Sequence, residues 1–127
     1  RRQGVPGLAA HPSTRRRSGN RLSGILYQRS CDLGLGFAFN IWSAALLLRM
    51  LAQQCDLEPG ELVWMGGDVH LYLNHAELVE AQLARQPAGD PRLVIARRPP
   101  TIFDYRIEDF AVEDYAPQSH LAAPVAV

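Results

Sequence analysis

A helix that is apolar almost all round constrains this chain more than any other segment. Residues Asn40 to Gln54 carry apolar side chains at helical spacing and contain good helix formers throughout. A helix of this kind is expected to be buried, because it has no broad polar face to turn toward water. Residues 22–30 before it and 61–73 after it have the composition and alternation of strands. The fold is therefore predicted to be α/β.

The rest of the chain divides into shorter elements. Asp56 to Gly60 contains proline and glycine and is predicted to be a turn. His75 to Gln86 has the pattern of an amphipathic helix, which the following prolines and glycine end. Arg92–Ala96 and Phe110–Val112 are predicted to be short strands. Because no linker interrupts residues 21–127, we expect one α/β unit over this range.

The first twenty residues differ in composition from everything that follows. Residues 1–20 are rich in Arg, Gly, Pro and Ser and show no helical or strand period, which predicts a disordered tail. The run Arg15 to Arg17 is expected to be solvated, and a phosphate or nucleic-acid patch is the alternative. We also consider the hypothesis that residues 1–20 are an out-of-frame or mis-started translation.

Charge and cysteine content exclude several classes of protein. The formal net charge is zero, so the total charge indicates neither a nucleic-acid nor a membrane partner. No apolar run is long enough to span a bilayer and no signal peptide is visible, which favours the cytoplasm. Cys31 and Cys55 lack a disulfide or metal-site pattern, so no metal is expected and each is predicted to be a buried thiol.

Polar residues cluster between Tyr27 and Asn40. The Arg29 guanidinium and the Ser30 hydroxyl are suited to a phosphate, and nearby glycines let the backbone approach a ligand. This combination suggests a phosphorylated small molecule. The alternative is an edge strand followed by a glycine turn, with Arg29 and Asp32 as a solvated ion pair.

A second polar cluster lies in the strand predicted over residues 61–73. Strand alternation places Asp68, His70 and Tyr72 on one face. Without further information, His70 would more often be a core histidine with satisfied hydrogen bonds. The residues on the opposite face are expected to pack inside: Val69, Leu71 and Leu73.

Together these segments resemble thymidylate synthase. The matching stretches are Leu26–Asp32, Gly36 to Asn40, Ala52–Leu57, Trp64 to His75, Ile102–Phe110 and Ala123–Val127. The resemblance covers Arg21 to Val127 and implies the C-terminal half of such an enzyme, with a mixed β-sheet flanked by helices and one buried central helix. It also implies a homodimer that methylates dUMP to dTMP and converts 5,10-methylenetetrahydrofolate, its co-substrate, to dihydrofolate.

The resemblance implies a role for individual residues. The dUMP ligands would be Gln28, Arg29, Ser30, Asp32, Asn40, His70 and Tyr72. The folate ligands would be Asp32, Leu35, Gly36, Phe39 and the Val127 carboxylate. Asn40 would read the uracil edge, and its use as the N-cap of the following helix is equally compatible with its position.

The catalytic nucleophile of the family is missing. Counting back from Gln28, its position falls on Ala9, and the adjacent histidine falls on Ala10. Cys31 is not the family's nucleophile and is not expected to replace it. We therefore expect a fragment that is inactive alone. The alternatives are a non-catalytic nucleotide- or RNA-binding module and a dCMP hydroxymethylase-like protein, which Asn40 disfavours.

Overall fold

A computed structural model describes residues 8–10 and 19–125 of the chain. The contacts group into two compact units, one within Arg1–His70 and the other within Leu71–Val127. Each unit has its own sheet, of three strands in the first and two in the second. The sequence had predicted a single unit over residues 21–127.

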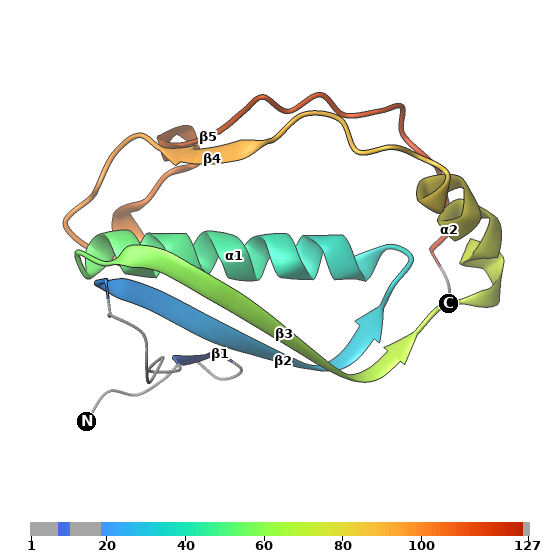
Figure 1. Cartoon of the computed structure of the whole chain (residues 1–127), viewed down its shortest axis with the longest axis horizontal. Coiled ribbons are helices and arrows are strands. Elements are labelled where there is room, and N and C mark those ends of the chain that lie inside the picture. The colour runs from blue at the N-terminus through green and yellow to red at the C-terminus, as the bar shows by residue number, and fades with distance from the viewer. Residues whose placement is uncertain (1–7, 11–18, 126–127) are drawn as a thin grey trace. The chain divides into compact units, whose positions relative to one another are not determined.

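The first unit is a mixed sheet covered by one long helix (Figure 1). The strands are β1 (Leu8–Ala10), β2 (Arg21–Asp32) and β3 (Glu58–His70), in the order β1-β2-β3. β1 is antiparallel to β2, and β3 is parallel to β2. A parallel pair needs a crossover connection, which helix α1 (Gly36–Gln54) provides as it packs along both strands. This confirms the predicted mixed α/β fold.

Helix α1 buries one stripe of its surface. Ala44, Leu48 and Ala52 recur every four residues and are buried, so they lie on one side of the helix. Phe39 and Trp42 are 76% and 52% exposed. Burial all round the helix was therefore wrong for this chain, because apolar composition does not say how many sides are covered. No helix in the described parts of the chain is long and apolar enough to cross a membrane.

The helix begins earlier than its sequence indicated. It starts at Gly36 with Leu35 at the N-cap position, where no side chain caps it, and ends at Gln54 as predicted. Asn40 thus lies inside the helix, and its proposed use as the N-cap was wrong. The two glycines before Asn40 obscured the start because glycine is a weak helix former.

Strand β3 ends at His70, earlier than predicted. Leu73 is 97% exposed and starts the 3-10 turn η1 (Leu73–His75), while Val69 and Leu71 are each 40% exposed. The expected burial of these three residues was wrong. Alternation identifies side chains that share a face, but it does not show that another layer covers that face.

Strand β1 lies in the segment that was predicted to be disordered. Ala9 pairs with Ile25 in the antiparallel register of β1 and β2. The structure thus assigns a strand to Leu8–Ala10. The arginine run of residues 15–17 lies outside the described residues.

The second unit contains helix α2 (Ala76–Leu83) and the antiparallel strands β4 (Arg92–Ile95) and β5 (Phe110–Glu113). Two 3-10 turns, η2 (Ile102–Asp104) and η3 (Ile107–Asp109), lie between the strands. The two strands and the helix were all predicted from the sequence, with ends that differ by a few residues.

Gly60 of β3 lies close to the backbone of β2, and a substitution there tests how closely the two strands pack. A β-carbon at Gly60 would lie 2.8 Å from the carbonyl oxygen of Leu22, a backbone atom beside the irregular register of β2. Gly60→Ala is expected to lower the free energy of unfolding by about 1–3 kcal/mol, because the strands must shift. Chemical denaturation measures this change.

Gly19→Ala is the matched control. A β-carbon there would meet only Arg21 Cγ, at 3.9 Å, so this substitution should leave stability nearly unchanged. Equal effects of the two substitutions would contradict the close β2–β3 contact.

Candidate functional site

The candidate site lies where β2 and β3 end. Because the strands are parallel, their carboxyl ends meet at one edge of the sheet, where ligands bind in open α/β sheets. The register places Ser30 opposite Asp68 and Asp32 opposite His70. The backbone continues this pairing, since the Leu33 N–H donates to the His70 carbonyl at 3.0 Å. Residues from both predicted polar clusters are thus brought together.

The turn after β2 brings Asp32 close to the start of α1. Asp32 Oδ1 accepts a hydrogen bond from the Gly34 N–H at 2.8 Å, which fixes the turn. A β-carbon at Gly36 would lie 3.6 Å from both Asp32 Cβ and Asn40 Oδ1. Asp32 and Asn40 therefore flank the space that Gly36 leaves open at the helix start.

A hydrogen-bond network holds the side chain of Asn40. Gln28 Nε2 donates to Asn40 Oδ1 at 2.8 Å and to the Ser30 carbonyl at 3.0 Å. The Trp64 indole N–H donates to Gln28 Oε1 at 3.0 Å. Phe37 contacts Trp64 in an edge-to-face arrangement with 5.0 Å between ring centroids. The sequence interpretation missed Trp64, because only the pairing of β3 with β2 shows that the indole N–H reaches Gln28.

Arg29 is exposed at the same edge of the sheet. Its guanidinium forms no hydrogen bond or ion pair with any residue that the structure describes, so the alternative Arg29–Asp32 ion pair was wrong. Ser30 is also exposed. A β-carbon at Gly67 would lie 3.0 Å from the Arg29 carbonyl oxygen. The backbones of the two strands are therefore close at this point.

His70 lies half-buried at the end of β3. Its Nδ1 is 3.3 Å from the carbonyl oxygen of Asp68 and 3.7 Å from the carboxylate oxygen Oδ2 of the same residue. Its side chain is 31% exposed, which differs from a fully enclosed core histidine. Tyr72 falls in the second unit, and Val127 lies outside the described residues.

The two cysteines differ in their surroundings. Cys31 is completely buried, and burial, followed by the charge of Asp32, raises the pKa of its thiol. Cys55 is exposed, so the prediction that both thiols are buried was right only for Cys31. A raised pKa and a lack of access both oppose reactivity, because the thiolate is the nucleophilic form. Cys31 therefore does not have the properties of a nucleophile. Within the described residues, no group of three His, Cys, Asp or Glu side chains could hold a metal ion.

Comparison with known proteins identifies the family of this chain. A sequence model described as thymidylate synthase matches residues 8–127. The chain belongs to the thymidylate synthase family. The family model matches from residue 8, whereas the resemblance in the sequence covers only Arg21 to Val127.

Named thymidylate synthases are close relatives. The enzyme of Novosphingobium aromaticivorans is 76% identical over 110 residues, which cover 87% of this chain and 35% of that protein. The enzyme of Sphingopyxis alaskensis is 73% identical over 111 residues, covering 87% and 36%. The chain thus spans about a third of the length of these relatives, less than the half expected. Thymidylate synthases are methyltransferases, and the family uses methylenetetrahydrofolate as co-substrate.

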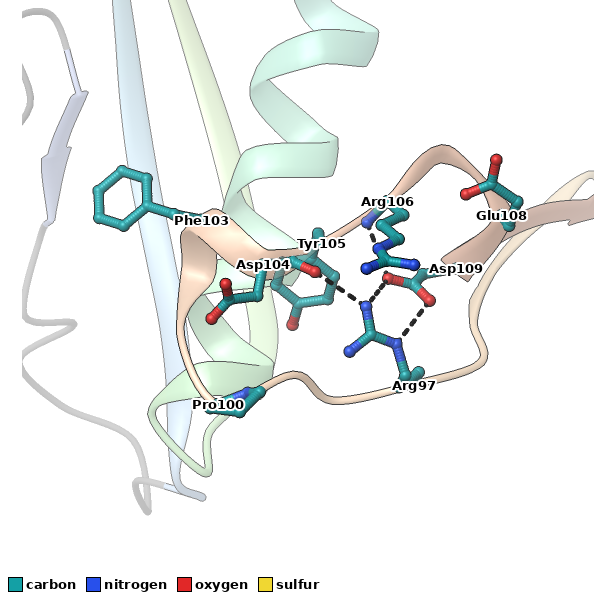
Figure 2. Close-up of a pocket in the computed structure, with 8 residues that line it drawn as sticks. All are labelled: Arg97, Pro100, Phe103, Asp104, Tyr105, Arg106, Glu108 and Asp109. Carbon is teal, nitrogen blue, oxygen red and sulfur yellow. Dashed lines mark hydrogen bonds and ion pairs between the residues drawn. The ribbon is translucent and has the colours of Figure 1, made fainter.

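The second unit has a pocket of about 800 Å³ (Figure 2). Arg97 and Asp109 lie at its wall. Arg97 donates from Nε and Nη2 to the two carboxylate oxygens of Asp109 at 2.8 and 2.6 Å, and the Arg106 N–H donates to Asp109 Oδ2 at 2.8 Å. Arg97 Nη2 also donates to the Asp104 carbonyl. These bonds hold η3 against the segment that follows β4.

The Arg97–Asp109 pair predicts how stability depends on pH. The Arg97 hydrogen bonds, followed by the Arg106 backbone N–H, lower the pKa of Asp109 below its ordinary 3.8. A lowered pKa contributes stability that is present above pH 3.8 and is lost as the pH falls through the folded-state pKa. Asp109→Asn should therefore lower the free energy of unfolding at neutral pH. It should also make the loss of stability below pH 3.8 less steep. Denaturation at several pH values measures both effects.

Asp90→Asn is the control, because Asp90 is exposed and forms no ion pair with a described residue. It should change neither stability at neutral pH nor its acid dependence. An Asp109→Asn variant with the unaltered acid profile would show that this pair does not contribute to stability.

Proposed function

We propose that this chain forms the nucleotide-binding part of a thymidylate synthase and binds dUMP at the carboxyl ends of β2 and β3. The parallel register is the observation that carries this proposal. It brings Ser30 opposite Asp68 and Asp32 opposite His70, so groups suited to a phosphate, a base and a sugar are gathered at one edge. The choice of dUMP as ligand follows from the family. The polar side chains at the ends of β2 and β3 are chemically suited to that ligand.

The phosphate is proposed to bind Arg29 and Ser30. A guanidinium carries its charge at any working pH and presents a planar set of donors to phosphate oxygens. Arg29 is exposed, and no carboxylate among the described residues neutralises it. The exposed Ser30 next to it adds an O–H donor.

The base and the sugar are proposed to bind the residues around them. Asn40 would pair with the uracil edge, and Asp32, which flanks the same space beside Gly36, would contact the base and the pterin of the folate. His70 and Tyr72 would hydrogen-bond the 3′-hydroxyl of the sugar. A ring nitrogen and a phenol O–H are both able to bond a hydroxyl group.

The folate is proposed to lie against the start of α1. Leu35 and the exposed Phe39 would supply apolar surface to the rings of 5,10-methylenetetrahydrofolate. Gly36, whose β-carbon would meet nothing closer than 3.6 Å, leaves room for the ligand. The Val127 carboxylate would close the site. No metal takes part in this proposal.

Methyl transfer is not proposed for the chain alone. Carbon 5 of uracil becomes nucleophilic only after a thiolate adds at carbon 6, and that step needs an activated nucleophile. The family position falls on Ala9, whose methyl group cannot add to a ring. Cys31 is buried with a raised pKa. The chain would therefore bind dUMP without converting it, whereas the homodimer of the family, acting in the cytoplasm, would carry out the reaction.

Removal of Arg29 tests the phosphate contact. Arg29→Ala should weaken dUMP binding by roughly 1.5–3 kcal/mol, about 10- to 150-fold in Kd, because it removes charge-assisted hydrogen bonds. Binding of deoxyuridine, which lacks the phosphate, should be unaffected. Calorimetric titration with both ligands measures the difference.

Arg49→Ala is the control, since Arg49 is an exposed arginine on α1 without an ion pair to a described residue. It should leave both affinities unchanged. An equal loss of dUMP and deoxyuridine binding in Arg29→Ala would contradict a phosphate-binding role.

A further inference from the structure

We infer that Trp64 is a positioning residue that selects the base through Gln28 and Asn40. The inference rests on the proposed function, because it concerns the same nucleotide site. Trp64 lies in β3 and Asn40 in α1, and Gln28 in β2 joins them by hydrogen bonds of 3.0 and 2.8 Å. The network therefore connects all three long elements of the first unit.

The orientation of the Gln28 amide is fixed by two groups that cannot exchange their roles. The Trp64 indole N–H can only donate, so it must face Gln28 Oε1. The Ser30 carbonyl can only accept, so it must face Gln28 Nε2. If the amide were turned over, two donors would meet at Trp64 and two acceptors at Ser30. A turned amide would thus lose both bonds.

The fixed Gln28 amide in turn fixes Asn40. Gln28 Nε2 has its second hydrogen directed to Asn40, so the oxygen of Asn40 must face it. The Asn40 amide nitrogen then points away from Gln28, and it has no hydrogen-bond partner among the described residues. Asn40 is exposed, which leaves this N–H2 group open to a ligand.

The outward group of Asn40 determines which base fits. An N–H2 donor pairs with a carbonyl oxygen, such as the one at position 4 of uracil, and it repels the amino group at the same position of cytosine. The Asn40 oxygen keeps a second lone pair, which can accept from the neighbouring ring N–H of uracil. The selection of a 4-carbonyl pyrimidine thus originates at Trp64, a residue that does not itself touch the base.

Gln28→Glu reverses the direction of the network. An ionised carboxylate still accepts from the Trp64 N–H, but it cannot donate to Asn40. Asn40 must then turn its N–H2 group inward and present its oxygen to the ligand. The ratio of the Kd for dCMP to the Kd for dUMP, measured by calorimetric titration, should fall at least about tenfold.

Two tryptophan variants separate positioning from packing. Trp64→Phe keeps an aromatic ring against Phe37 but removes the N–H, so the ratio should fall by a smaller factor, because the Ser30 carbonyl still holds Gln28. Trp42→Phe, at an exposed tryptophan of α1, should leave the ratio unchanged. A packing defect would weaken both nucleotides alike. An unchanged ratio in both Gln28→Glu and Trp64→Phe would overturn the inference.

A measurement without nucleotide tests the network independently of the proposed function. Solvent exchange of the Gln28 side-chain amide protons, followed by NMR, should be slow in the unaltered chain and faster in Trp64→Phe. Exchange as fast as that of the exposed Gln86 side chain would overturn the inference. Slow exchange together with a failure to bind dUMP would support the orientation of Asn40 and would contradict the proposed function alone.

Discussion

The parallel pairing of β2 with β3 is the interaction on which the candidate site depends. Hydrogen bonds across this pair set the register that brings Asp32 opposite His70. Because side chains alternate along a strand, a slip of one residue would send every site side chain to the other face. Helix α1 makes the parallel pairing possible as the crossover, and its buried stripe of small and aliphatic residues holds it on both strands.

This arrangement connects packing with recognition. Trp64 contacts Phe37 at the start of α1 and holds Gln28 of β2 by a hydrogen bond, so the groups that join helix and sheet also orient Asn40. In the second unit, the Arg97–Asp109 pair acts only on local structure, because its charges satisfy each other. The Trp64–Gln28–Asn40 network therefore leaves the Asn40 N–H2 group open to a ligand. In the Arg97–Asp109 pair, the two charges bind each other.

The sequence predicted the order and type of most elements, and the patterns are clearest in the three long ones, β2, α1 and β3. Its errors arose where burial depends on more than the local pattern. Leu73 belongs to the alternating pattern, but strand β3 ends at His70 and Leu73 is exposed. The helix start was missed because glycine is a weak helix former. Strand β1 has only three residues, and its pairing with β2 is not visible in composition. For the site, Arg29 and Asn40 were found as residue types suited to phosphate and base, but the role of Trp64 requires the register between two strands.

The most direct test is a titration of the isotope-labelled chain with dUMP, followed residue by residue by NMR. We expect the backbone signals of Arg29, Ser30, Asp32 and Asn40 to shift together, with saturation at one common Kd, while the signal of Asp109 stays in place. Shifts confined to the residues around the Arg97–Asp109 pair would contradict the assignment of the nucleotide site to the ends of β2 and β3. The absence of a saturable shift at these strand ends would contradict it too.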